Sequence, residues 1–347
     1  MKCNRQAALL LTVALSAILL FAGCGDATDT NAPLAGKKFA IVVKSEGNKY
    51  FEVMVDGFCS VVESKGGTPI VREPATATAE EQIIIVNELI SEDVDCIAIA
   101  SNSETALDPS LEKAIAKGIS VLSFDSSVSP ESRALHVNQA DTTRIAWKLM
   151  AAAADITGGT GQIAILSTTN QAHNQNIWID EMRTILERGT YPGLTLVDIV
   201  YGEDDYQKSY EKTEYLIQKY PELSAIIAPT AAGMPGVAEC IMDNGLADRI
   251  KITGLGMPSQ MAEYIGQDRV CPYMFLWDPE DVGRLTAYAA IALVNKTITG
   301  EVGEILPAGD MGEYEIMQDQ FGGSELVLQE DPIRFDSSNI AEWKSRY

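Results

Sequence analysis

The chain has 347 residues, 46% hydrophobic and 22% charged, a composition typical of a globular protein long enough for two domains. It holds 49 acidic and 26 basic residues, so its formal net charge at pH 7 is −23. Such a surface repels nucleic acid and anionic lipid headgroups, and we expect neither as a partner.

The N-terminus has the three parts of a secretory signal peptide. Lys2 and Arg5 are positively charged, an apolar run covers residues 7–21, and two small residues then precede Cys24. The apolar run is shorter than the roughly 20 residues of an ordinary spanning helix. The alternatives are an uncleaved anchor and an ordinary signal.

The end of this segment resembles a lipobox, although Phe21 stands where leucine is usual. We therefore expect residues 1–23 to be a lipoprotein signal peptide and Cys24 to carry the lipid. Residues 24–36 are short of large apolar side chains and fit a flexible tether. The predicted location is the extracytoplasmic face of the cell membrane.

Four further cysteines follow in the body of the chain: Cys59, Cys96, Cys240 and Cys271. They are widely spaced, form no CxxC motif and lie in or beside apolar runs. We expect buried free thiols, with one disulfide as the alternative, and neither a metal site nor a cofactor.

Short apolar runs alternate with amphipathic segments along the first part of the body. Predicted strands cover residues 39–43, 97–100 and 121–124, and predicted helices cover residues 50–65, 80–91 and 109–117. This βαβαβ order predicts a parallel sheet with helices on both faces.

The same pattern restarts after Gly158 and Gly159. Predicted strands cover residues 163–166, 194–200, 225–228 and 250–255, and predicted helices cover residues 177–188, 206–219 and 235–244. The sequence therefore predicts an α/β fold with two doubly wound parallel-sheet lobes in tandem.

The last part contains a predicted strand over 274–277, a helix over 280–297, and short strands near 312–317 and 325–328. One reading attaches all of it to the second lobe. We favour a chain that crosses back, so that several crossovers form a hinge. The predicted N-terminal lobe is then residues 37–138 and 278–306, and the C-terminal lobe is residues 139–277 and 307–347.

Ligands of doubly wound sheets lie beyond the carboxyl ends of the strands, so the residues there are candidates for a cleft between the lobes. In the first lobe Lys44 offers hydrogen-bond donors, and Asp125 offers a carboxylate for two hydroxyl groups. Tyr50 and Phe51 offer apolar faces for a sugar-like ring. Each has an ordinary structural alternative as a surface, cap or core residue.

In the second lobe Asn174 and Gln175 offer both donors and acceptors; asparagine can also cap the helix that follows, so the alternative for at least one of the three carboxamides at 174–176 is a structural role. Further candidates follow later strands: Pro229, Thr230, Ala231, Met257 and Trp277. Together these positions suit a small neutral polyol.

With these positions in view, the chain resembles the type I periplasmic-binding-protein family of sugar importers of the ABC class. The resemblance covers residues 37–347 and lies closest to the branch of rhamnose-binding and autoinducer-2-binding receptors. It rests on Phe124-Asp125-Ser126 through Pro130, Val137-Asn138-Gln139, Asn174 through Trp178, Ile226 through Thr230, and Leu276-Trp277-Asp278.

The resemblance implies a monomeric two-lobed clamp that encloses its ligand and delivers it to an ABC permease. Lys44, Asp125, Gln175, Pro229 and Ala231 match the positions that hold autoinducer-2 in its receptors. The second aspartate of those receptors is replaced here by an asparagine at position 174, as in rhamnose-binding members, and residues 201–205 and 207–210 also resemble that branch. L-Rhamnose is the favoured ligand, with autoinducer-2 or another small sugar as the alternative.

Two other classes of protein are disfavoured. An exported carbohydrate-active enzyme is the more remote alternative, because the chain has no GxSxG, HExxH, P-loop or GxGxxG motif and only two histidines, His136 and His173. A DNA-binding regulator would carry an N-terminal helix-turn-helix where this chain has its signal peptide.

Overall fold

The structure is a computed structural model and describes residues 34–347. The predicted signal peptide, Cys24 and most of the predicted tether lie outside the described residues. Among residues 34–347, no helix combines the length and the apolar character that crossing a membrane requires.

The first lobe is built on a seven-stranded sheet in the order β13-β14-β5-β4-β3-β1-β2. All neighbours are parallel except β13 and β14. Its strands are β1 (Lys38–Val42), β2 (Thr68–Arg72), β3 (Cys96–Ile99), β4 (Ser120–Phe124), β5 (His136–Asn138), β13 (Met317–Gln318) and β14 (Ser324–Val327).

Helices cover both faces of this sheet. Along β1, Phe39 and Ile41 belong to one apolar cluster with α1 and α9, whereas Ala40 and Val42 belong to a second cluster with α2 and α3. A strand buried on both faces needs a continuous apolar run, which is why its sequence does not alternate. The helices are α1 (Lys49–Ser64), α2 (Ala79–Ser91), α3 (Asp108–Ala116), α9 (Pro279–Val294) and the 3₁₀ turn at Pro130–Ser132.

The second lobe is built on a four-stranded parallel sheet in the order β7-β6-β8-β9. This order corresponds to β2-β1-β3-β4 of the first lobe, so the two lobes share one winding. Its strands are β6 (Thr160–Ser167), β7 (Gly193–Tyr201), β8 (Leu223–Ala228) and β9 (Lys251–Gly254). Its helices are α4 (Thr142–Thr157), α5 (His173–Glu187), α6 (Tyr206–Lys219), α7 (Met234–Asp243) and α8 (Pro258–Met261).

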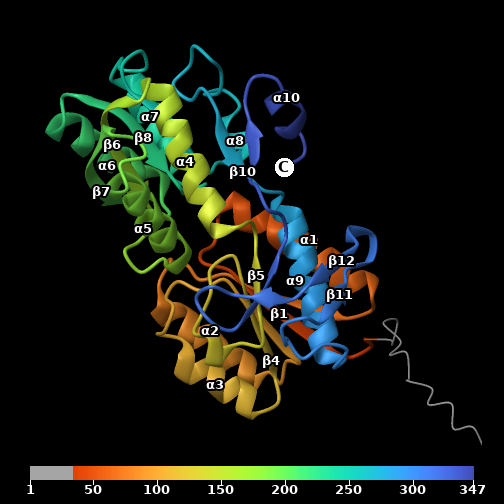
Figure 1. Ribbon diagram of the computed structural model, residues 1–347. Helices are drawn as coiled ribbons and strands as arrows, with labels where there is room; N and C mark the ends of the chain where they lie inside the picture. The colour runs from red at the N-terminus through yellow and green to blue at the C-terminus, as the bar shows by residue number, and fades with distance from the viewer. Residues whose placement is uncertain (1–33) are drawn as a thin grey trace, which may run out of the picture.

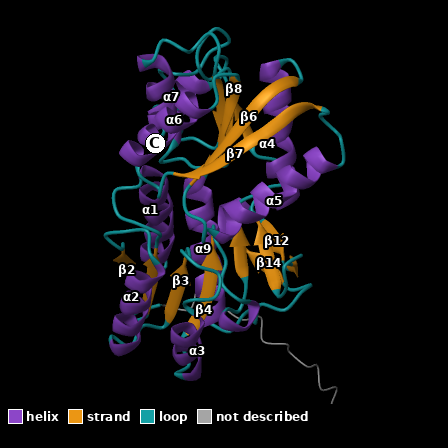
Figure 2. Cartoon of the chain, turned by 90° about the vertical axis from the view of Figure 1, so that its left-hand side faces the viewer, coloured by secondary structure: helices purple, strands orange, loops and turns teal. Residues whose placement is uncertain are grey.

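Small elements complete the chain. Strand β10 (Met274–Leu276) pairs with β15 (Ile333–Phe335), β11 (Ile305–Pro307) pairs with β12 (Glu313–Glu315), and α10 (Ile340–Trp343) lies at the C-terminus. A further 3₁₀ turn covers Gly309–Met311. Figure 1 places the second lobe above the first, and Figure 2 shows α5 between the two sheets.

The chain passes between the lobes at residues 139–141, 277–278 and 328–332, after β5, β10 and β14. The predicted α/β class with a multi-crossover hinge is confirmed. Within residues 307–347, the strands up to residue 327 differ from the predicted second-lobe assignment, because β14 pairs with β5 and carries β13 into the first sheet, whereas β15 pairs with β10 beside the second lobe. Strands β13 and β14 complete a sheet edge, and such short edge strands have little periodicity of their own.

Four described cysteines are free thiols, in agreement with the prediction. Cys96, Cys240 and Cys271 are buried and Cys59 is partly buried. Burial raises the pKa of the Cys59 thiol to about 11, so it stays protonated at neutral pH. Within residues 34–347, no group of three or more His, Cys, Asp or Glu side chains is placed to hold a metal ion.

Candidate functional site

A pocket lies between the two lobes, at the carboxyl ends of the parallel strands. It encloses about 390 Å³ of empty space, part of it open to solvent. Both lobes and the second crossover line it. The lining residues are Lys44, Asn48, Tyr50, Phe51, Asp125, Thr168, Asn174, Gln175, Trp178, Asp204, Pro229, Ala231, Leu255, Leu276 and Trp277.

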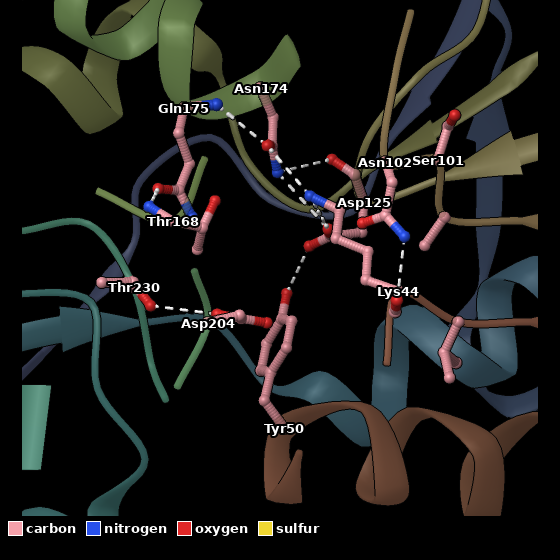
Figure 3. Close-up of polar contacts among 12 residues, drawn as sticks. Lys44, Tyr50, Ser101, Asn102, Asp125, Thr168, Asn174, Gln175, Asp204 and Thr230 are labelled. Carbon is pink, nitrogen blue, oxygen red and sulfur yellow. Dashed lines mark hydrogen bonds and ion pairs between the residues drawn. The ribbon is translucent and has the colours of Figure 1, made fainter. Parts of the chain in front are cut away.

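Asp125, directly after β4, is the centre of the polar contacts (Figure 3). The hydroxyl of Tyr50 donates a hydrogen bond to its Oδ1 at 2.8 Å, and Asn174 Nδ2 donates to its Oδ2 at 3.3 Å. Lys44 Nζ lies 3.7 Å from Oδ2 and donates to Asn174 Oδ1 at 3.3 Å. Asp125 and Lys44 come from the first lobe and Asn174 from the second, so this network joins the lobes.

The backbone at Asp125 has a φ of 57°, in the left-handed region. Aspartate adopts this conformation more readily than most residues, at a cost of about 1–3 kcal/mol. The turn leaves the Asp125 carboxylate bonded to Tyr50 and Asn174 in the pocket instead of continuing β4. Such strain is typical of residues held in place for binding.

An aromatic wall borders the same pocket. Trp277 Nε1 donates to the Tyr50 hydroxyl at 2.7 Å, and the two rings meet edge to face with centroids 6.1 Å apart. Phe51 contacts Tyr50 at 5.2 Å and Trp178 contacts Trp277 at 6.2 Å, again between centroids. This wall offers apolar surface beside the polar groups of Asp125.

The carboxamides at the start of α5 come from the second lobe. Gln175 Oε1 accepts hydrogen bonds from Ser167 Oγ at 2.6 Å and from the Thr168 backbone N–H at 3.0 Å. These two bonds orient the amide group. Asn174 Oδ1 also accepts from the Gln175 backbone N–H at 2.9 Å, so Asn174 supports its helix and reaches Asp125 as well.

A second carboxylate, Asp204, enters the pocket from the loop after β7. Its Oδ1 accepts from Thr230 Oγ1 at 3.1 Å, and its Oδ2 accepts from Asn48 Nδ2 at 2.8 Å. Because Asn48 lies at the N-terminus of α1, this pair is a further contact between the lobes. Figure 3 shows Asp204 and Thr230 side by side.

Burial controls the ionisation of these groups. Desolvation raises the pKa of Asp125 above its ordinary value, against the opposing effects of nearby Lys44 and the Tyr50 hydrogen bond. Desolvation likewise raises the pKa of Asp204. The pKa of Tyr50 lies well above its usual value through burial and the charge of Asp125, so Tyr50 stays a hydroxyl donor at neutral pH.

Nine of the eleven predicted ligand-binding residues line this one pocket: Lys44, Tyr50, Phe51, Asp125, Asn174, Gln175, Pro229, Ala231 and Trp277. Thr230 lies behind the surface and holds Asp204 and the start of α7, where it accepts from the Gly233 N–H. Met257 is fully buried in the core and is not among the lining residues. The ligand contacts themselves remain predictions.

The sequence reasoning did not select six lining residues: Asn48, Thr168, Trp178, Asp204, Leu255 and Leu276. Asp204 could have been selected from the sequence, because it lies in the segment after strand β7 as Asp125 lies after strand β4. Three acidic residues in a row, 203–205, obscured which one turns inward.

Comparison with known proteins gives the family. The family model described as periplasmic binding protein domain matches residues 39–298. A solved ABC-transporter solute-binding protein from Clostridium phytofermentas, with bound L-rhamnose, is 46% identical with a TM-score of 0.88, covering 90% of this chain and all of that one.

Two more distant proteins are also similar. LsrB from Clostridium saccharobutylicum, in complex with AI-2, superposes with a TM-score of 0.83 over 88% of this chain and 99% of that chain, and its 21% identity shows the fold alone. The D-ribose/D-allose-binding protein of Pseudomonas aeruginosa is 23% identical over 231 residues, which are 62% of this chain and 70% of that protein.

These matches confirm the resemblance inferred from the sequence, and the Clostridium phytofermentas relative is a solute-binding protein of an ABC transporter. The described chain has the corresponding two-sheet architecture with a pocket between the sheets. A solute-binding protein of an ABC transporter, solved with a bound sugar, is among its similar structures. The chain belongs to the periplasmic binding protein domain family.

Proposed function

We propose that this protein is the lipid-anchored, extracytoplasmic receptor of an ABC importer, that it captures L-rhamnose between its lobes, and that it catalyses no reaction. The observation that carries the proposal is the buried pocket in which Asp125, Lys44 and Asn174 lie beside an aromatic wall. The 46% identity to a solute-binding protein solved with L-rhamnose supports the choice of sugar.

A deoxyhexose matches the chemistry of this pocket. The Asp125 carboxylate accepts hydrogen bonds from adjacent hydroxyl groups, and Lys44, Asn174 and Gln175 donate to the sugar oxygens. The C–H face and the C6 methyl group pack against the aromatic wall around Trp277. In the described part of the chain Gln175 Nε2 has no hydrogen-bond partner, which leaves it as a donor for the ligand.

Capture proceeds by closure of the lobes. Lys44 and Asp125 belong to the first lobe and Asn174, Gln175 and Pro229 to the second, so a bound sugar stabilises the closed form by contacting both. Each hydrogen bond contributes about 0.5–1.5 kcal/mol, and about six of them with an aromatic face reach micromolar affinity, roughly −8 kcal/mol. The closed receptor then docks on its permease.

Autoinducer-2 is the second candidate. Lys44, Asp125, Gln175, Pro229 and Ala231, which match the autoinducer-2 positions, all line the same pocket. The asparagine at position 174 in place of an aspartate favours L-rhamnose instead.

The test has two parts. Mass spectrometry of the ligand released from purified protein distinguishes a methylpentose from a five-carbon furanosyl species. Calorimetric titration with L-rhamnose, autoinducer-2, D-ribose and D-galactose then ranks the affinities. Micromolar or tighter binding of L-rhamnose, at least tenfold tighter than the others, is the expected result. Tighter binding of autoinducer-2 would select the second candidate, and chemical turnover of any sugar would overturn the receptor function.

A further inference from the structure

Asp204 is placed as firmly as Asp125 but comes from the opposite lobe. Its two carboxylate oxygens are bonded to Thr230 and Asn48 at 3.1 and 2.8 Å. It follows Glu203, and both residues have left-handed backbone with φ of 55° and 54°. Two consecutive strained residues are kept when the surrounding structure requires their placement.

The charges around the pocket are unbalanced. Among its described lining residues, Lys44 is the one cation and faces two carboxylates, Asp125 and Asp204. Within the described residues, the hydrogen-bond partners of the Asp204 side chain are the neutral groups of Thr230 and Asn48, and Lys44 is shared with Asp125. The closed pocket thus carries one more negative than positive charge.

An adjoining groove adds to this imbalance. A wider groove between the lobes shares Asp204 with the pocket, and its lining holds six carboxylates and two lysines, Lys208 and Lys212. Lys208 forms an ion pair with Glu203, which reduces its free positive charge. An anionic solute therefore meets a negative field both in the groove and in the pocket.

We propose that Asp204 is a second ligand-contacting carboxylate and that it restricts the receptor to uncharged sugars. In the ligand-bound closed form, a sugar hydroxyl group donates to Asp204 in place of the hydrogen bond that Asn48 donates here. A sugar acid or sugar phosphate would place its own negative charge beside the buried Asp125 and the partly buried Asp204, an arrangement that low-dielectric surroundings penalise. This inference rests on the proposed function, because it assumes a sugar ligand.

The experiment compares three sugars of one ring configuration. L-Rhamnose has a methyl group at C6, L-mannose has a neutral hydroxymethyl group there, and L-mannuronate has a carboxylate. Calorimetry at pH 7 with wild-type protein and Asp204→Asn gives the ratio of L-mannose to L-mannuronate affinity. Asparagine keeps the shape and tolerates the left-handed backbone.

In Asp204→Asn we expect the ratio of L-mannose affinity to L-mannuronate affinity to fall at least tenfold. We also expect the affinity for L-rhamnose to fall about tenfold or more, because a hydrogen bond to a charged group is lost. Glu112→Gln is the control, since it removes an exposed charge on α3, away from the pocket and the groove, and should leave the ratio within about twofold. Thermal melting checks the fold, and Asp204→Ser replaces Asp204→Asn if the latter unfolds.

An unchanged ratio in a folded Asp204 variant overturns the charge selectivity, and an unchanged L-rhamnose affinity overturns the ligand contact. Failure of the wild-type protein to bind L-rhamnose sinks the proposed function instead. In that case the same affinity ratio is measured with the neutral and acidic forms of the sugar that is released from the purified protein. A failure of the proposed function is thereby distinguished from a failure of the charge selectivity.

Discussion

At the scale of single residues, strained backbone and buried charge occur together at Asp125, directly after strand β4. Asp125 combines a left-handed backbone, burial and a raised pKa with hydrogen bonds from Tyr50 and Asn174. Backbone strain and desolvation of a charge both lower the stability of the folded protein. They are retained at positions where they serve the binding of a ligand. Asp125 is therefore the residue whose change should separate binding from folding.

Asp125→Asn tests that separation. Asparagine adopts the left-handed conformation and keeps the side-chain shape, but it replaces one acceptor with a donor. We expect the affinity for L-rhamnose to fall about 10- to 100-fold, the equivalent of roughly 1.5–3 kcal/mol for a charged hydrogen bond. Calorimetry measures the affinity. Glu112→Gln, on the exposed face of α3, is the control and should bind like the wild type.

The melting temperature of Asp125→Asn should stay close to that of the wild type, because the loss of the ion pair with Lys44 opposes the gain from removing a desolvated charge. Wild-type affinity in a folded Asp125→Asn protein would show that this carboxylate does not contact the sugar.

At the scale of elements, the crossovers carry polar groups that the surrounding packing does not fully satisfy. Gln139, at the first crossover, is completely buried, and neither polar atom of its side chain has a partner within residues 34–347. Glu325 in β14 lies before the third crossover and accepts from Asn138 Nδ2 at 2.9 Å. The unsatisfied amide of Gln139 thus lowers the stability of the first crossover.

Gln139→Met should stabilise the protein. Methionine has nearly the same shape without polar atoms, and an unsatisfied buried polar group costs about 1–3 kcal/mol. We expect a higher free energy of unfolding in urea denaturation, by about 1 kcal/mol or more. Gln171→Met, at an exposed position, is the control and should change little. A less stable Gln139→Met protein would mean that the amide is hydrogen-bonded in solution, for instance to an ordered water.

Glu325 predicts a pH dependence of stability. Burial raises the pKa of its carboxyl group to about 7, above its value of about 4.3 in an unfolded chain. The folded state therefore binds a proton that the unfolded state has lost, and stability from this group rises as the pH falls from 8 toward 5. Melting temperatures of wild type and Glu325→Gln across this range measure the effect.

As the pH falls, the melting temperature of the wild type should rise relative to that of Glu325→Gln, since glutamine mimics the protonated acid at every pH. The variant should be the more stable of the two at pH 8. Parallel melting curves for the two proteins over the whole range would exclude Glu325 as the titrating group.

At the scale of the whole molecule, two sheets of the same winding face each other, and the ligand site exists only where they meet. Lys44 to Asn174 and Asn48 to Asp204 are hydrogen bonds between side chains more than 100 residues apart in sequence. The same groups are the proposed sugar contacts, so a bound sugar would take over these hydrogen bonds and join the lobes through its own hydroxyl groups. The proposed lipid at Cys24 would hold this clamp near its permease.

Cys24→Ser tests the anchor. In cells that express the full chain, the wild type should fractionate with the membrane and incorporate labelled palmitate. The variant should do neither, because serine lacks the thiol that carries the diacylglycerol. Cys59→Ser is the control and should behave like the wild type, since Cys59 lies on α1. Membrane retention and labelling of Cys24→Ser would refute lipidation at this position.

The sequence by itself determined the doubly wound class and most of the pocket. Apolar runs such as residues 39–43 reveal strands buried on both faces, and in this class the residues that follow such strands meet at one edge, as Lys44 and Asp125 do. Helix α4 was not predicted from the sequence, although Asp141 caps its N-terminus and Gly158 its C-terminus.

Only the tertiary structure decided the rest. Strands β13 and β14 are too short to show a period, and their place in the first sheet depends on pairing with β5. Asp204 turns inward and Met257 into the core because of packing between distant segments, which no local pattern encodes. Short-range patterns report the burial of an element, whereas the choice among neighbouring polar side chains depends on long-range contacts.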